Sequence, residues 1–127
     1  MLTYRTSNDD LVVTIRPCYL DDPSDPIEKR FAFGLSVEVR NRHSSDIRLI
    51  RGEWRIENAE DHPPGGRSRT IERENALIRS GERQRWTTSC VISTFRGAVK
   101  GRLFFEGPDG TRLRAEAPMV PLRASVN

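Results

Sequence analysis

Apolar residues occupy every second position between residues 31 and 39. Side chains of a β-strand point to opposite faces in turn, so this spacing predicts a strand with one buried face. The residues of this run are Phe31, Phe33, Leu35, Val37 and Val39, and shorter alternations occur at Val13, Ile15 and Tyr19; Ile47 and Leu49; Trp54 and Ile56; Trp86, Thr88, Cys90 and Ile92; Leu103 and Phe105; and Leu113, Ala115 and Ala117. The pattern predicts six or seven strands.

Clusters of Pro, Gly and Asp mark the connections between these strands. Residues 21–26 contain two prolines and three aspartates, residues 41–46 are polar, and residues 60–66 contain two prolines and two glycines. Such residues favour turns because they restrict or widen the accessible backbone dihedral angles. The Gly-Pro-Asp-Gly sequence at 107–110 predicts a tight hairpin. The apolar residues of 69–78 form no helical stripe, so we predict a loop and a short strand there.

The length of 127 residues fits one domain. Several short strands, with no helical segment to carry parallel crossovers, favour two packed antiparallel sheets. We therefore predict an all-β, single-domain sandwich of the immunoglobulin or fibronectin type III kind over residues 1–127, with its core between residues 11 and 122. Trp54 and Trp86 are expected to lie in this core, because large aromatic side chains anchor such interiors.

The net charge is +3 at pH 7, from 21 basic and 18 acidic residues, and 19 of the basic residues are arginine. Both signs are interspersed along the chain, whereas nucleic-acid-binding domains usually carry a clustered basic stripe, so a nucleic-acid partner is not favoured. No apolar run approaches the roughly 18 residues of a membrane span, and residues 1–10 contain no hydrophobic segment of a signal peptide. We expect a cytoplasmic protein that makes no membrane contact.

Few residues could support catalysis or hold a metal ion. His43 and His62 are the only histidines, both in predicted loops, and neither has a spacing that presents two ligands on one face. Cys18 and Cys90 are too few and too far apart for a disulfide framework or a CxxC motif. Cys90 shares the phase of Trp86, which indicates a buried thiol rather than a nucleophile. We therefore predict no enzymatic activity and no cofactor.

The segment from residue 67 to residue 85 contains six arginines and three glutamates, which makes it locally basic. Guanidinium groups bind carboxylates and phosphates through paired hydrogen bonds, so this segment is a candidate surface for an acidic partner or another anion. The residues that we predict to contact it are Arg69, Arg73 and Arg83, with Arg83 facing away from Trp86. An ordinary solvated face is the alternative interpretation, because glutamates are interspersed among the arginines.

Short motifs in this chain resemble those of the ApaG family in the same order. They are Tyr19-Leu20, Ser24, Pro26 and Arg30-Phe31, then Trp54 with Ile56, Ser80-Gly81-Glu82, Thr88-Ser89, Asp109-Gly110, and Pro118 with Leu122. The resemblance spans about residues 13–122. ApaG proteins usually carry a GxGxxG loop before their Pro-Gly-Glu turn, but here no glycine lies between Arg67 and Ser80. A phosphate cradle needs such glycines, so the chain resembles a divergent member without that loop.

Three classes of function remain open at this point. We expect a non-catalytic binding module that contacts another protein through loops or an exposed sheet edge, and a homodimer through such an edge is a further expectation. ApaG proteins are associated with cobalt and magnesium resistance, so the resemblance implies an alternative: a protein that handles a small ligand or a divalent cation through Glu60, Asp61 and His62. Hydrolysis of phosphate esters is the third and least favoured class.

Overall fold

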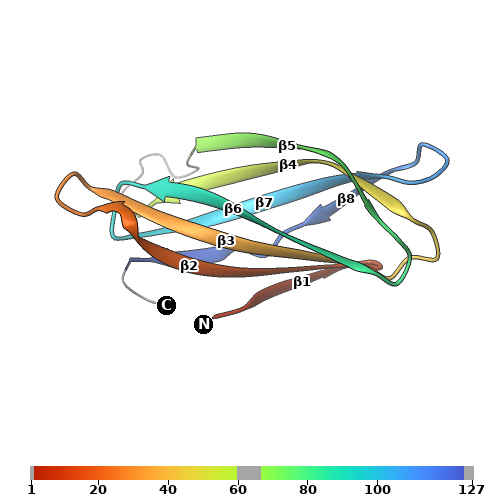
Figure 1. Cartoon of the computed structure of the whole chain (residues 1–127), viewed down its shortest axis with the longest axis horizontal. Helices are drawn as coiled ribbons and strands as arrows, with labels where there is room; N and C mark the ends of the chain where they lie inside the picture. Colours follow the sequence, from red (N-terminus) through yellow and green to blue (C-terminus); the bar gives the residue numbers. More distant parts are fainter. Residues whose placement is uncertain (1, 60–66, 125–127) are drawn as a thin grey trace.

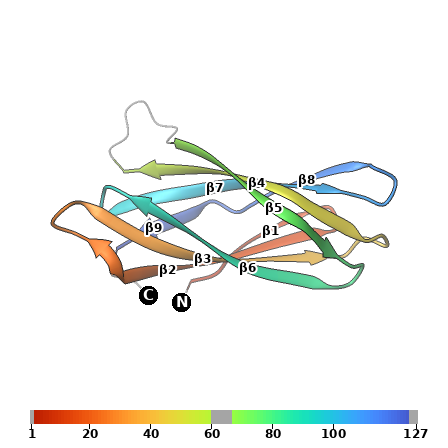
Figure 2. The same cartoon turned by 45° about the horizontal axis from the view of Figure 1, so that its top comes forward.

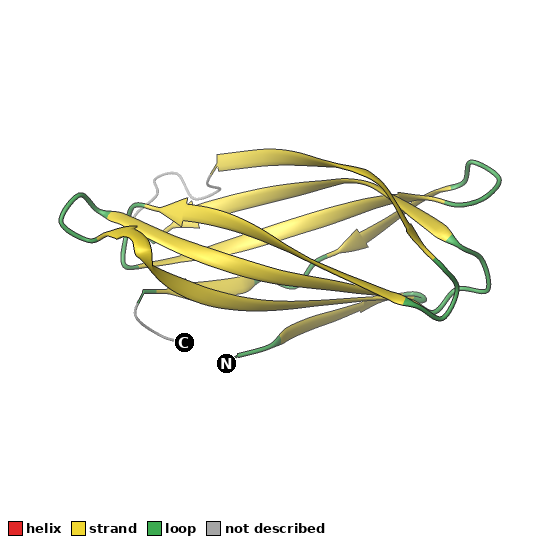
Figure 3. Cartoon of the chain, in the orientation of Figure 1, coloured by secondary structure: helices red, strands yellow, loops and turns green. Residues whose placement is uncertain are grey.

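The structure is a computed structural model that describes residues 2–59 and 67–124, with side chains described for all of these except 67–75. Every regular element in these residues is a strand (Figure 3). The strands are β1 (Tyr4–Asn8), β2 (Leu11–Asp25), β3 (Arg30–Asn41), β4 (Ile47–Asn58), β5 (Arg67–Ile78), β6 (Arg83–Ile92), β7 (Arg96–Glu106), β8 (Arg112–Glu116) and β9 (Val120–Arg123). This part of the chain contains no helix long and apolar enough to cross a bilayer.

Two antiparallel sheets pack face to face (Figures 1 and 2). The first sheet has the strand order β1-β2-β3-β6, and the second has the order β5-β4-β7-β8, with β9 also paired to β7. The chain crosses from one sheet to the other between β3 and β4, between β5 and β6, and between β6 and β7. The predicted immunoglobulin or fibronectin type III-like sandwich is thus confirmed as the fold class.

The core lies between the sheets and is formed by the alternating residues of the longest strands. On β3, Phe33, Leu35, Val37 and Val39 are at most 1% exposed, as their spacing predicts. Trp54 on β4 is also buried, at 4% exposed. Its indole lies against Gly101 on β7, where an added Cβ atom would come within 2.4 Å of the ring. A glycine at position 101 is therefore required by the space that the indole occupies.

Two other predicted core residues lie on β6, which is an edge strand of its sheet. Cys90 is buried, as predicted, whereas Trp86 is only half-buried. An edge strand has a neighbour on one side alone, so it shields its inward side chains less well. Cys18 pairs in register with Gly34, and Cys90 pairs with Phe33, the next residue of β3. The two cysteines therefore lie on opposite faces of the sheet, and they form no disulfide.

The strand count and two boundaries differ from the sequence-based prediction. The described residues contain nine strands rather than six or seven, because β1 and β9 were not predicted. β5 is a strand of 12 residues rather than a loop and a short strand. β2 continues through the predicted turn to Asp25, with an irregularity between Leu20 and Asp25. The missed strands lie at sheet edges or are short, so they need fewer apolar residues than the central strands.

One side of the sandwich is closed by side chains of β1. The Thr6 hydroxyl and the Asn8 amide donate hydrogen bonds to the Glu116 carbonyl on β8, at 2.7 and 3.0 Å. The Glu116 backbone N–H donates in turn to the Asn8 side-chain oxygen at 2.9 Å. On the other side, β5 pairs with β4 and β6 pairs with β3. β5 and β6 are therefore the edges at which the predicted homodimer would form, and that dimer stays a prediction.

Candidate binding face

Arginine side chains gather on the outer face of the β1-β2-β3-β6 sheet. Adjacent strands lie about 4.8 Å apart, so residues that pair across strands place their side chains next to one another. Arg5 pairs with Thr14, Thr14 with Glu38, and Glu38 with Arg85, which forms one row across four strands. Five arginines lie on the regularly paired part of this outer face, here called the arginine face: Arg5, Arg16, Arg40, Arg83 and Arg85. Arg30 lies farther along β3, where it pairs with Asp25.

The alternation of the strands places these arginines outward. On β3, Val37 and Val39 enter the core, so Glu38 and Arg40 must point to the opposite face. β6 follows the same rule, because half-buried Trp86 alternates with exposed Arg83 and Arg85. This confirms the predicted outward position of Arg83. The burial of the core residues thus determines which charges the outer face displays.

Glu38 lies in the middle of the arginine face and is strongly shielded from solvent. Its side chain is 12% exposed, and its Oε1 accepts a hydrogen bond from Arg85 Nη2 at 2.8 Å. This hydrogen bond is the largest of the effects that lower the pKa of Glu38, and the positive charges of Arg85, Arg83 and Arg16 lower it further against the opposing effect of desolvation. Glu38 is therefore held as a carboxylate among the arginines.

The arginine face keeps a surplus of positive charge after this pairing. Glu38 is the one acidic side chain among the outward residues that pair in the regular part of these four strands, and it is bound to Arg85; beyond the irregularity in β2, Asp25 pairs with Arg30. Arg5 donates its Nε–H to the Thr14 hydroxyl at 3.2 Å, which orients its guanidinium without neutralising it. Arg40 and Arg83 pair directly across the strands and form no ion pair with any described side chain. The face is therefore suited to bind anions.

Replacing Glu38 by glutamine is expected to lower the free energy of unfolding at pH 7 and to have less effect in acid. A lowered pKa in the folded state means that the carboxylate stabilises the fold well above the ordinary value of 4.5. This stabilisation is lost as the pH falls below that value and through the lower pKa of the folded state. Urea unfolding of the native protein and Glu38→Gln between pH 7 and pH 3 measures the difference.

The matched control for this experiment is Glu28→Gln, in the exposed turn between β2 and β3. The Glu28 backbone N–H bonds to Asp25, but its side chain forms no ion pair with a described residue. We expect the control to differ little from the native protein at any pH. A loss of stability in Glu38→Gln that is the same at pH 7 and at pH 3 would contradict the ion pair.

The structure distributes the sequence-predicted binding residues over both sheets. Arg83 lies on the arginine face, next to Arg40. Arg69 and Arg73 lie on β5 of the other sheet, where Arg69 pairs in register with Trp54 and Arg73 falls within an irregular stretch. The side chains of Arg69 and Arg73 are outside those described, so their part in binding stays a prediction. The predicted metal ligands Glu60, Asp61 and His62 also lie outside the described residues.

The described residues offer limited chemistry for catalysis or metal binding. His43 Nδ1 lies 3.4 Å from Asp10 Oδ2, and no hydroxyl or thiol among the described side chains bonds to this imidazole. No group of three or more His, Cys, Asp or Glu residues in the described part of the chain could hold a metal ion. The arginine face, which includes the sequence-predicted Arg83, is therefore the candidate binding site.

Sequence reasoning identified only Arg83 of the five arginines on this face. The outward direction of each could be read from the alternation around it, as for Arg40 beside Val39. The grouping of the five arginines on one face could not be predicted from the sequence, because it requires β1, β2, β3 and β6 to be neighbours in space. A strand far along the sequence, β6, supplies two of the five arginines, and strand order is not encoded in local spacing.

Comparisons with known proteins identify the family of this chain. The sequence model of the ApaG domain matches residues 21–107. Protein ApaG of Brucella canis is 29% identical over 110 residues, which cover 87% of this chain and 85% of that protein. The crystal structure of the putative ApaA protein from Bordetella pertussis superposes with a TM-score of 0.79 at 23% identity, over 93% of this chain and 96% of that one.

A second X-ray structure has a TM-score of 0.78 at 17% identity, and the match covers 92% of this chain and 89% of that one. At these identities the two solved structures support the sandwich fold and carry no information on function. The family match rests instead on the sequence, and residues 21–107 include β3 and β6 of the first sheet and β4, β5 and β7 of the second. The match covers more than half of the chain, and this protein therefore belongs to the ApaG domain family.

Proposed function

We propose that this protein is a non-catalytic interaction module that binds an acidic segment of a partner protein on its arginine face. The observation that carries the proposal is the gathering of five arginines, from four strands, around one carboxylate that is already paired. The rest of the chain is nearly balanced in charge, since the net charge of the whole chain is only +3. A local surplus of positive charge on a nearly neutral protein favours binding to a partner with a negatively charged surface.

The chemistry of the arginine face suits carboxylates. A guanidinium group presents planar, paired donors that match a carboxylate, and it is less strongly hydrated than a lysine ammonium group. Arg40 and Arg83 are exposed and adjacent, so they are the first residues that an approaching anion would meet. Arg5 and Arg85 are oriented by Thr14 and Glu38. Part of the entropic cost of ordering these side chains is therefore already met in the free protein.

The spacing of charges on the arginine face fits a protein partner better than it fits nucleic acid. Duplex DNA presents about one charge per 1.7 Å, and its binding proteins extend basic residues along that length. The arginine face instead mixes its charges with small neutral residues, Ser36 and Thr87, which lie between the strands' arginines. Isolated positive charges separated by hydroxyl groups match an acidic peptide with spaced carboxylates.

Reversal of two adjacent charges on this face is expected to abolish binding to an acidic peptide. The variant Arg40→Glu/Arg83→Glu places two carboxylates on the proposed contact surface, in the row next to Glu38. We expect its affinity for a labelled peptide of alternating glutamate and glycine to fall at least tenfold, because charged hydrogen bonds are lost and repulsion replaces them. Fluorescence anisotropy at 50 mM and 150 mM salt measures the affinity and its screening.

The opposite sheet supplies a matched control. Arg55 on β4 and Lys100 on β7 are also exposed and pair directly across two strands, and Arg55→Glu/Lys100→Glu changes the net charge from +3 by the same four units to −1. We expect this control to bind within threefold of the native protein. Equal losses of peptide affinity in the two variants would show that net charge alone attracts the peptide, and would contradict the proposed face. Tighter binding of the native protein to duplex DNA than to the peptide would contradict a protein partner and indicate nucleic acid instead.

A further inference from the structure

A pocket of about 390 Å³ opens over the second sheet, on the opposite side of the molecule from the arginine face. It lies where β4, β7 and β8 meet, near the hairpin between β7 and β8. The residues that line it include the apolar Ile50, Phe104 and Leu113 and three arginines, Arg51, Arg112 and Arg114. A hollow of this size falls within the lower range of small-molecule sites, which are mostly apolar with a few polar groups.

A β-bulge in β4 builds one wall of this pocket. The register against β7 shifts between Leu49 and Arg51, so that Ile50 and Arg51 together stand opposite Phe104. An extra residue in one strand redirects its side chains, and bulges occur often next to functional sites. Here the bulge brings Ile50, which is half-buried, beside Arg51 at the pocket. The alternation of a regular strand would have separated these two side chains.

An arginine, an aromatic ring and a second arginine cross the three strands in one row. Arg51 pairs in register with Phe104, and Phe104 pairs with Arg114. The Arg51 guanidinium carbon lies 4.1 Å from the centre of the Phe104 ring, a cation–π contact. Arg51 and Arg114 are also bound through Nε, to Glu53 at 3.3 Å and to Glu116 at 3.6 Å. These contacts orient two guanidinium groups at the pocket before a ligand arrives.

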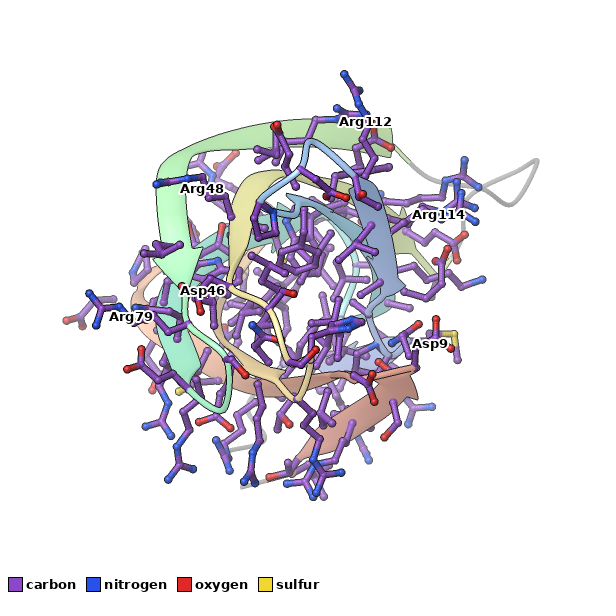
Figure 4. All side chains as sticks on the ribbon, turned by 90° about the vertical axis from the view of Figure 1, so that its right-hand side faces the viewer. Asp9, Asp46, Arg48, Arg79, Arg112 and Arg114 are labelled. Carbon is purple, nitrogen blue, oxygen red and sulfur yellow. The ribbon has the colours of Figure 1, made fainter. Side chains whose placement is uncertain are left out.

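Arg112 supplies a third guanidinium group, and no described side chain neutralises it by an ion pair. Figure 4 looks along the sandwich and shows Arg112 and Arg114 directed outward, away from the interior. Glu106, which pairs in register with Arg112, is the one acidic residue in the pocket wall. The residues that line the pocket carry three positive charges and one negative charge, and Arg51 and Arg114 are already paired with Glu53 and Glu116. Arg112 therefore has the charge that attracts a monoanion, while the Glu106 carboxylate disfavours a doubly charged phosphate.

We infer that this pocket binds a small organic carboxylate with an aromatic or branched aliphatic body. The carboxylate would accept paired hydrogen bonds from Arg112 and Arg114, because the guanidinium fork matches its two oxygens. The body would lie against Ile50 and Phe104, where it removes apolar surface from water. This site is independent of the proposed function, since it lies on the other sheet and needs no residue of the arginine face.

Titration with benzoate and 4-methylpentanoate tests this inference. The methyl resonances of Ile50 and Leu113 are expected to shift with saturation for both carboxylates. The neutral analogues benzamide and 4-methylpentanamide are expected to bind at least tenfold more weakly, because they lose the charged hydrogen bonds. Acetate and inorganic phosphate measure the effect of charge alone. Shifts by acetate or phosphate as strong as those by benzoate, or no shift with any of these probes, would overturn the proposal.

Single substitutions locate the site. Arg112→Gln is expected to weaken benzoate binding at least tenfold, whereas Arg123→Gln, an exposed arginine on β9, should leave it within twofold. Phe104→Leu should weaken benzoate more than 4-methylpentanoate, since only the aromatic body stacks on the ring. Unchanged benzoate affinity in Arg112→Gln would contradict the assignment. The variant Arg40→Glu/Arg83→Glu should still bind benzoate. A failure of the pocket proposal can therefore be distinguished from a failure of the proposed peptide binding.

Discussion

Replacement of Trp54 by alanine is expected to lower the free energy of unfolding by about 3–5 kcal/mol, the usual cost of removing a large buried aromatic side chain. The indole is 4% exposed and fills the space between Gly101 on β7 and Gly52 on its own strand. A cavity of about 110 Å³ already lies beside it, lined in part by Leu49 and Leu103. The alanine variant would enlarge this cavity. Urea unfolding followed by circular dichroism measures the change.

Two further variants separate this packing from a general effect of tryptophan. Trp86→Ala removes the same side chain from a half-buried position, and we expect a smaller loss of about 1–3 kcal/mol. Gly101→Val alone should cost about 1–3 kcal/mol, because its Cβ atom would lie 2.4 Å from the indole. In the Trp54→Ala background the same valine should cost at least about 0.5 kcal/mol less. Additive losses would show that the two residues do not share this space.

The central strands could be predicted because each has one face against the core. On β3 the alternation of Phe33, Leu35 and Val37 gives both the strand and its inward face. β5 could not be predicted in the same way, because its first part, Arg-Ser-Arg-Thr-Ile-Glu-Arg-Glu, alternates charges rather than apolar residues. Its position at a sheet edge explains this, since an edge strand gains its backbone hydrogen bonds from one neighbour and tolerates charged side chains.

The β-bulge in β4 that shapes the pocket can be recognised in the sequence pattern. Core residues on β4 occupy odd positions at Ile47 and Leu49 but even positions at Gly52 and Trp54. A strand without a bulge keeps one parity along a face, so a change of parity indicates an inserted residue. The residues that lie beside the bulge could not be identified from the sequence. Phe104 and Arg114 come from strands whose position beside β4 is a property of the whole fold.

Replacement of Asn41 by alanine is expected to lower the free energy of unfolding by about 2–4 kcal/mol, because three hydrogen bonds of a buried side chain are lost together. Asn41 is 0% exposed at the end of β3. Its Nδ2 donates to the carbonyls of Ser45 and Ile78 at 2.9 and 3.0 Å, and its Oδ1 accepts from the His43 N–H at 2.9 Å. These bonds hold the loop between β3 and β4 to the end of β5.

The backbone of Asn41 joins the same end of the sandwich to the turn before β6. Its N–H donates to the Glu82 carbonyl at 2.9 Å, and its carbonyl accepts from the Gly81 N–H at 2.8 Å. These bonds remain in the variant, so the loss should come from the side chain. The neighbouring exposed residue provides the control, since Arg42→Ala should change the stability by no more than about 0.5 kcal/mol.

Hydrogen exchange can locate the effect of Asn41→Ala as well as its size. The loop amides that the side chain holds should exchange faster in the variant, whereas the amides of β7 should keep protection that falls only with the global stability. The His43 N–H is the most direct reporter, because its acceptor is removed. A variant as stable as Arg42→Ala, with His43 still protected, would show that these three bonds do not hold the loop between β3 and β4 to the end of β5.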